Sequence, residues 1–169
     1  MSAEILRVHP DEPQPDRIDY IVSCLRKGGV IALPTDTFYG LAVDPVNLAA
    51  VEQIYQIKTR QKHKPLSLLI SGLSQAYELA RDTDPQLDKL ADRFWPGPLT
   101  IIVRAGTKLP LRSTANTGNV ALRVPDAAIA RRWWMPSACR SRLRQRICRA
   151  RRNALTRHAC ATRSGNGFL

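Results

Sequence analysis

The most informative stretch of the sequence is LPTDTFYGL at residues 33–41. It closes a short apolar run, Val30–Leu33, that is typical of a buried strand, and Pro34 ends this strand because proline lacks the N–H that a sheet ladder needs. A hydroxyl–carboxylate–hydroxyl run, residues 35–37, then precedes Gly40. Folds that alternate strands with helices place ligands at strand ends, so the run is a candidate binding site. The same residue types also form ordinary turns, and their spacing alone leaves both interpretations open.

Outward from this stretch, hydrophobic periodicity predicts helices that alternate with strands. Apolar residues three and four apart predict helices over residues 16–28, 48–58, 73–80 and 85–94. Continuous apolar runs predict further strands over 65–70, 99–103 and 120–124. We expect Asp16 to cap the first helix. The buried stripe of the last helix is expected to consist of Leu87, Leu90, Ala91 and Phe94. This alternation is typical of an α/β or α+β layer fold.

A cluster of basic residues lies in the connection between the predicted helix 48–58 and the predicted strand 65–70. It consists of Lys58, Arg60, Lys62 and Lys64. Cations at a helix C-terminus often do no more than offset the helix dipole. Arginine also grips a phosphate with two parallel hydrogen bonds, and lysine adds a point charge, so the cluster suits a polyphosphate equally well.

Arg123 lies inside the apolar run 120–124. An arginine in a buried strand costs free energy unless it is paired. We therefore expect a carboxylate or phosphate partner for its guanidinium.

The net charge of +12 is distributed unevenly over the 169 residues. Residues 131–169 contain eleven arginines and no lysine or acid, which leaves fifteen basic and fourteen acidic residues in 1–130. The chain therefore divides into a near-neutral segment and a basic tail. No apolar run approaches the roughly 18–20 residues that a bilayer requires, and the acidic N-terminus does not resemble a signal peptide. We expect a cytoplasmic protein without a membrane partner.

Four segments occur in a characteristic order: PTDTFYGLA, KTRQKHKPLSLLI, RFWPGPLTIIV and VALRVPD. In sequence and spacing they closely resemble the YrdC-like threonylcarbamoyl-AMP synthase family. The resemblance covers residues 15–130 and implies a twisted mixed sheet flanked by helices, with a broad, positively charged hollow. In this family the hollow is described as binding ATP and also double-stranded RNA or tRNA.

The resemblance implies a nucleotidyltransferase. Family enzymes condense L-threonine, bicarbonate and ATP to threonylcarbamoyl-AMP and pyrophosphate, as the first step of threonylcarbamoyladenosine formation in tRNA. Such a displacement at phosphorus depends on positioning and on cations that relieve charge. By the family pattern, Thr37 holds threonine and Arg123 pairs with its carboxylate. The implied ATP-binding residues, acting with magnesium that bridges the phosphates, are Lys58, Arg60, Lys64 and Asn119. The alternative is a YrdC-like module that binds double-stranded RNA or tRNA without synthase activity.

The tail departs from the family pattern. The family completes its site with an S-x-N motif, usually within T-S-A-N-L-S-G, shortly after the R-V-P-D strand, and that segment is absent here. One explanation is a divergent basic tail that binds nucleic acid. However, a tail rich in arginine, alanine and cysteine with two tryptophans resembles GC-rich DNA read out of frame.

The genetic code allows a test of this second explanation. When the third base of each codon is read with the first two bases of the next, residues 133–136 force valine, aspartate and alanine. Continuing to Ala150, permitted third bases allow T-S-A-N-L-S-G. We infer a single-base shift near codons 130–132. The expected product is a truncated YrdC-like domain over 1–130, with an incomplete C-terminal part, followed by a disordered arginine-rich tail over 131–169. Its synthase activity is expected to be impaired.

Overall fold

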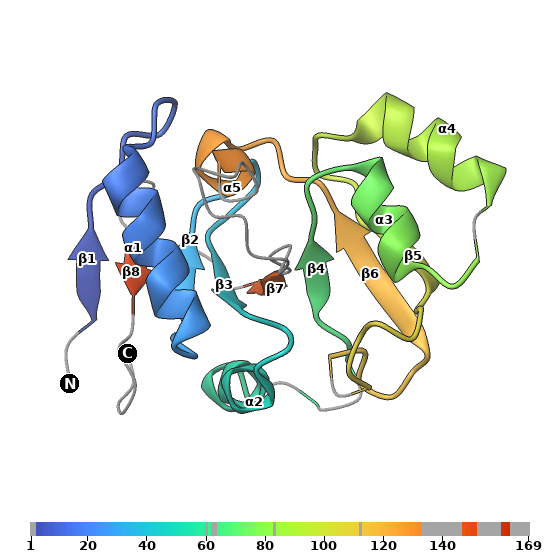
Figure 1. Ribbon diagram of the computed structural model, residues 1–169, viewed down its shortest axis with the longest axis horizontal. Helices are drawn as coiled ribbons and strands as arrows, with labels where there is room; N and C mark the ends of the chain where they lie inside the picture. Colours follow the sequence, from blue (N-terminus) through green and yellow to red (C-terminus); the bar gives the residue numbers. More distant parts are fainter. Residues whose placement is uncertain are drawn as a thin grey trace.

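The computed structural model describes residues 3–59, 61, 64–82, 84–111, 113–132, 147–151 and 160–162. In this part of the chain, eight strands form one sheet in the order β1-β8-β2-β3-β7-β4-β6-β5 (Figure 1). The strands are β1 (Glu4–Leu6), β2 (Ile31–Leu33), β3 (Gly40–Val43), β4 (Ser67–Leu69), β5 (Ile101–Arg104), β6 (Asn119–Arg123), β7 (Ile147–Arg151) and β8 (Cys160–Thr162). β4 and β6 run parallel, and the other described strand pairs are antiparallel.

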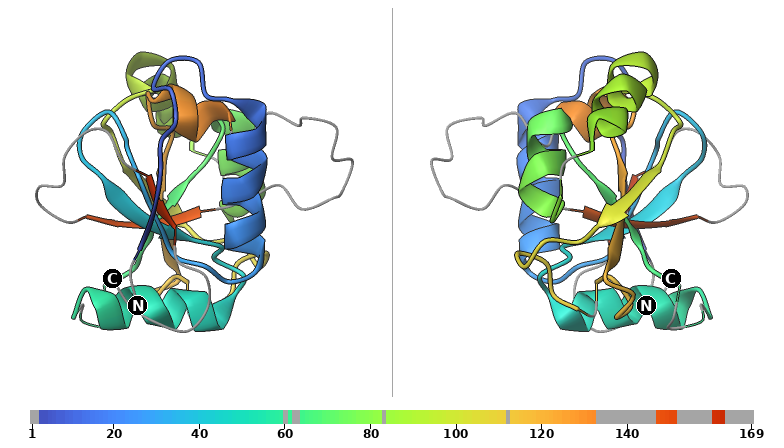
Figure 2. Two further views of the ribbon diagram at one scale, coloured as in Figure 1. Left: turned by 90° about the vertical axis from the view of Figure 1, so that its left-hand side faces the viewer. Right: turned by 90° about the vertical axis from the view of Figure 1, so that its right-hand side faces the viewer.

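Five helices accompany the sheet within the described residues: α1 (Pro15–Arg26), α2 (Leu48–Ile57), α3 (Leu73–Leu79), α4 (Pro85–Phe94) and α5 (Ala128–Arg132). In Figure 1, α1 lies beside β1 and β2, α3 and α4 lie at the β5 end of the sheet, and α2 lies at the bottom, viewed nearly along its axis. The side views show the strands fanned at large angles to one another, as strand twist requires (Figure 2). The expected twisted mixed sheet flanked by helices is confirmed.

The start of α1 differs from the expectation. Gln14 is the N-cap residue and makes no side-chain cap, while Pro15 is the first helical residue. Asp16 instead lies in the first turn, where its carboxylate is 3.5 Å from Arg17 Nε. Proline suits the first helical position because its missing N–H has no partner there anyway, so the helix begins before Asp16 can cap it. The expected end is confirmed, because Gly28 follows the helix with a φ of +82° that favours glycine.

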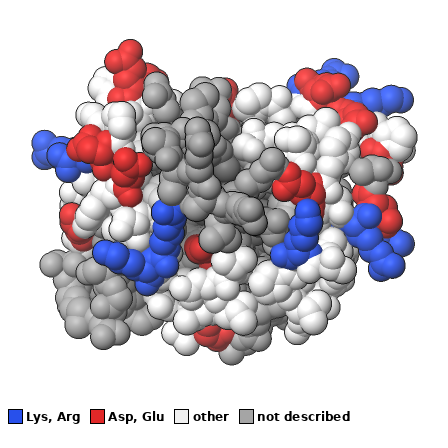
Figure 3. Space-filling view, in the orientation of Figure 1, with Lys and Arg blue, Asp and Glu red and all other residues white. Residues whose placement is uncertain are grey.

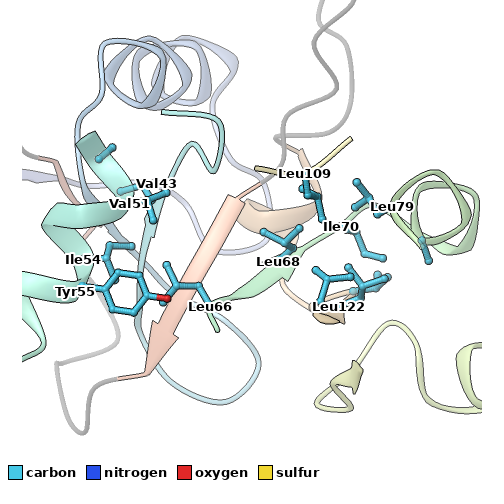
Figure 4. Packing of buried hydrophobic residues seen from close by; sticks show 14 of the residues in the cluster. Val43, Val51, Ile54, Tyr55, Leu66, Leu68, Ile70, Leu79, Leu109 and Leu122 are labelled. Carbon is cyan, nitrogen blue, oxygen red and sulfur yellow. The ribbon is translucent and has the colours of Figure 1, made fainter. Parts of the chain in front are cut away.

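The two faces of the sheet bury separate hydrophobic clusters. Leu68 and Leu122 belong to a cluster that also contains buried residues of α2 and α3 (Figure 4). The neighbouring Leu69 belongs to a second cluster, which contains Ile18 and Ile21 of α1. This division follows from strand geometry, because successive side chains point to opposite faces.

The buried stripe of α4 is narrower than expected. Leu87 and Ala91 are buried, whereas Leu90 and Phe94 are 38% and 43% exposed. Residues four apart share one line along a helix, and only that line of α4 contacts the core. The expectation for Leu90 and Phe94 was therefore wrong, since it assumed a helix covered along a wider stripe.

Residues 34–39 form the loop of a β-hairpin. β2 ends at Leu33 and β3 begins at Gly40, and the two pair antiparallel with Leu33 opposite Gly40. β3 was not expected, because it is only four residues long and begins at a glycine. The hairpin therefore places the loop of residues 34–39 at the carboxyl end of β2 and the amino end of β3.

Two segments of the tail pair with the sheet. β7 lies between β3 and β4, and β8 lies between β1 and β2. This differs from the expectation of a disordered tail. Strand pairing uses backbone N–H and C=O groups, which every non-proline residue carries whatever its side chain. The other residues of 133–169 lie outside the described part of the chain. None of the helices in the described part is long and apolar enough to cross a membrane.

Candidate substrate-binding site

Arg123, the last residue of β6, is 4% exposed and is held by two loops. Its Nε donates to the Gly97 carbonyl oxygen at 2.9 Å, and its Nη2 donates to Asp36 Oδ2 at 2.6 Å. Its Nη1 lies 3.5 Å from Thr37 Oγ1. The structure therefore supplies the expected carboxylate partner, Asp36, and brings together the two residues implied in threonine binding.

The loop at 34–39 is shaped by Thr35. Its hydroxyl donates to the Phe38 carbonyl oxygen at 2.7 Å and lies 3.3 Å from the Thr37 hydroxyl. The backbone N–H groups of Thr37 and Phe38 point to the same Thr35 oxygen at 3.4 Å. Thus Thr35 builds the turn, while Asp36 and Thr37 extend from it toward Arg123. The turn interpretation of this run is confirmed, and the binding-site interpretation stays a prediction.

The guanidinium retains hydrogen-bonding capacity. Arginine carries five N–H donors, and Gly97, Asp36 and Thr37 each accept one among the described residues. The remaining N–H groups suit the oxygens of a small carboxylate, because arginine binds carboxylates through parallel hydrogen bonds. With the Thr37 hydroxyl beside it, the position can recognise a carboxylate that carries a further polar group.

Helix α2 anchors the connection between α2 and β4, the basic segment, which contains the basic candidate residues. Lys58 is the C-cap residue of α2, and its Nζ atom is buried. The buried Tyr55 donates from its hydroxyl to the Lys64 carbonyl oxygen at 3.0 Å, so α2 also fixes the far end of the loop. Lys64 is exposed. Arg60 lies outside the described residues. The structure thus places two of the three basic candidates on one anchored loop.

Asn119 lies at the opposite end of β6 from Arg123. It is the first residue of the strand and is exposed, and the four-residue separation corresponds to roughly 13 Å along a strand. Lys64 precedes β4, which runs parallel to β6, so Lys64 and Asn119 share the amino ends of these strands. Basic and acidic side chains are interspersed over the described surface seen in Figure 3. Among the described candidates, Thr37 and Arg123 lie at the carboxyl end of β6, whereas Lys64 and Asn119 lie at its amino end.

Two contributors to the site escaped the sequence reasoning. Asp36 belongs to the polar run 35–37, but no sequence pattern connects it to Arg123, which lies far along the chain. Gly97 contributes only its carbonyl oxygen, for which no side-chain signal exists. Its N–H donates to the Val124 carbonyl oxygen at 2.8 Å, which docks the Gly97 turn against the end of β6.

Residues 23–137 match the sequence profile of the Sua5_yciO_yrdC family, which carries the description "Telomere recombination". The matched range contains the loop at 34–39, the basic segment and Arg123. The chain belongs to the Sua5/YciO/YrdC family. The resemblance carried by the four sequence motifs is therefore confirmed.

Comparisons with individual members of the Sua5/YciO/YrdC family support this assignment. Threonylcarbamoyl-AMP synthase of Bacillus subtilis is 37% identical over 121 residues, which are 71% of this chain and 34% of the relative. The crystal structure of P. abyssi Sua5 complexed with L-threonine has a TM-score of 0.74 and 29% identity, covering 82% of this chain and 39% of that one. E. coli YciO has a TM-score of 0.78 and 27% identity, covering 88% and 69%.

The chain is shorter than these synthases. It spans 31% of the Pyrococcus abyssi synthase, 34% of the Bacillus subtilis synthase and 61% of the Coxiella burnetii synthase. It therefore shares one region with them.

Proposed function

We propose that this chain carries the threonine and ATP sites of a threonylcarbamoyl-AMP synthase, a nucleotidyltransferase that acts in tRNA modification in the cytoplasm. The observation that carries the proposal is Arg123, which is buried beside Thr37 and keeps N–H groups for a ligand carboxylate. A structural relative with 29% identity, P. abyssi Sua5, was crystallised with L-threonine, which supports an amino acid as the ligand.

In the proposed reaction, the chain binds and orients substrates and does not form a covalent intermediate. The threonine ammonium group gives one proton to solvent, and the lone pair of the resulting amine bonds to the carbon of bicarbonate-derived carbon dioxide. The nitrogen then gives a second proton to solvent, which leaves a carbamate. A carbamate oxygen then attacks the α-phosphorus of ATP, and the bond to the β,γ-pyrophosphate breaks. Arg123 and Thr37 hold the amino acid, so the reacting groups meet in a fixed geometry.

Cationic groups in the connection between α2 and β4 are proposed to hold the triphosphate. Lys58, Arg60 and Lys64 would neutralise phosphate charge, and the Asn119 side chain would add hydrogen bonds. Among the described residues, no three His, Cys, Asp or Glu side chains gather closely enough to hold a metal ion. We propose that magnesium would be carried by the ATP phosphates, as the family resemblance implies.

Isothermal titration calorimetry of the 169-residue chain tests the binding part of the proposal. We expect heat from L-threonine and from magnesium–ATP, and loss of the threonine heat in Arg123→Ala. The absence of heat from both ligands would overturn the proposed function. RNA binding without threonine or ATP binding would instead identify the alternative, a nucleic-acid module, with an affinity that falls steeply as salt rises.

We also propose that residues 131–169 are translated out of frame and that turnover is impaired as a result. The segment T-S-A-N-L-S-G permitted by the shifted frame supports this proposal. Threonine-dependent pyrophosphate release should be weak in this chain and rise in a variant with the frame restored. Sequencing of the gene and transcript from codon 125 onward is the decisive check, and an intact frame in both would overturn the proposal.

A further inference from the structure

Asp36 has hydrogen-bonding capacity beyond its contact with Arg123. A carboxylate has about four lone-pair sites, and among the described residues Asp36 accepts one hydrogen bond, through Oδ2. Its side chain is 14% exposed, so it remains reachable from the site although it is largely enclosed. The carboxylate and the guanidinium thus present opposite charges at one point.

We propose that Asp36 and Arg123 bind the amino-acid substrate together, with Asp36 receiving the α-ammonium group and Arg123 the α-carboxylate. This inference rests on the proposed function and assigns a binding role to a residue that the sequence motifs left without one. An α-amino acid carries its ammonium and carboxylate groups on the same carbon atom. Its ammonium group can therefore face Asp36 while its carboxylate faces Arg123. The contacting atoms of these two residues are 2.6 Å apart.

Charge balance explains why this arrangement selects a zwitterion. Arg123 alone would attract any carboxylate or phosphate, including a phosphate of ATP. With Asp36 in contact, the pair is close to neutral, and a second negative group at Arg123 is repelled by Asp36. A zwitterion supplies a positive group for Asp36 and a negative group for Arg123, so all four charges are compensated in a largely enclosed site.

Two ligands distinguish this role from a purely structural one. L-threonine carries ammonium, carboxylate and hydroxyl groups, whereas 3-hydroxybutyrate retains the carboxylate and hydroxyl and lacks the amine. In calorimetry on the full chain, the wild-type protein should bind threonine at least about 10-fold more tightly than 3-hydroxybutyrate, because one charged hydrogen bond separates them. Equal affinities would overturn the inference without any variant.

The variant Asp36→Asn sharpens the test. It should weaken threonine binding about 10- to 100-fold while changing 3-hydroxybutyrate binding less than about 3-fold. Equal losses for both ligands would show that Asp36 only positions Arg123, and would overturn the inference while leaving the proposed function intact. No heat from threonine with the wild-type chain would overturn the proposed function itself.

Controls separate folding from recognition. Asp82→Asn removes an exposed carboxylate far along the chain from the loop at 34–39 and should leave both affinities unchanged. If Asp36→Asn fails to fold, Asp36→Glu keeps the carboxylate and should retain the preference for threonine over 3-hydroxybutyrate. Loss of that preference in a folded Asp36→Glu protein that still binds both ligands would contradict the assignment.

Discussion

The two ends of β6 are built in different ways. At the carboxyl end, Arg123 is buried and contacts residues from two loops that are distant in sequence. At the amino end, Asn119 is exposed, and its backbone N–H donates to the nearby Thr117 hydroxyl at 3.2 Å. The proposed amino-acid end is thus assembled by tertiary contacts, whereas Lys64 and Asn119 at the proposed phosphate end are exposed. Substitutions at the first end should therefore affect stability and binding together, and substitutions of Lys64 or Asn119 should affect binding alone.

The largest effect is expected from Arg123→Ala. It leaves the Asp36 carboxylate largely enclosed without its cation, which should lower the free energy of unfolding by about 3–5 kcal/mol. Urea unfolding followed by circular dichroism measures this change. The matched control, Arg104→Ala, removes an exposed arginine of β5 and should change the free energy by less than about 0.5 kcal/mol. Equal losses of unfolding free energy at the two positions would contradict the prediction that the buried arginine contributes more to stability than the exposed one.

A smaller effect is expected from Thr37→Val, which replaces a hydroxyl with a methyl group of similar size. Loss of one neutral hydrogen bond corresponds to about 1 kcal/mol, so threonine affinity should fall about 5-fold. Affinity for ATP should not change, because Thr37 lies at the amino-acid end. Calorimetry with each ligand measures both values, and Thr37→Ser should recover most of the threonine affinity. The exposed Thr107→Val serves as the control.

The smallest effect is expected from Lys64→Ala at the phosphate end. An exposed charge contributes about 0.2–1 kcal/mol, so ATP affinity should fall no more than about 5-fold, and less at high salt. Stability should be unchanged within about 0.5 kcal/mol. Lys89→Ala, at an exposed position of α4, controls for the loss of a positive charge. A large loss of stability in Lys64→Ala would show that this end also depends on tertiary contacts.

Local signals predicted some elements closely and others not at all. The helix expected over 85–94 has those bounds in the structure, because Pro85 occupies its first position and the Asp84 side chain accepts from the Gln86 N–H at 2.8 Å. β1 was not expected, since it is three residues long and pairs with β8 from the far end of the chain. Short strands depend on their partners more than on their own residues.

The stripe of α4 shows the same limit within a correctly predicted helix. Periodicity identified Leu87 and Ala91 as inward-facing, but it gave no indication of how far the neighbouring surface extends. Leu90 and Phe94 are exposed because burial depends on what packs against the helix.

The requirement for a partner at Arg123 was determined by the sequence alone, because a guanidinium in an apolar strand is costly unless an anion compensates it. Which of the fourteen acidic residues supplies that anion was decided only by the tertiary structure. Asp36 and Arg123 are 87 positions apart, and no local pattern spans such a separation. Their contact exists because the β2–β3 hairpin carries its loop to the end of β6, and the burial that makes the charge costly also holds its partner in place.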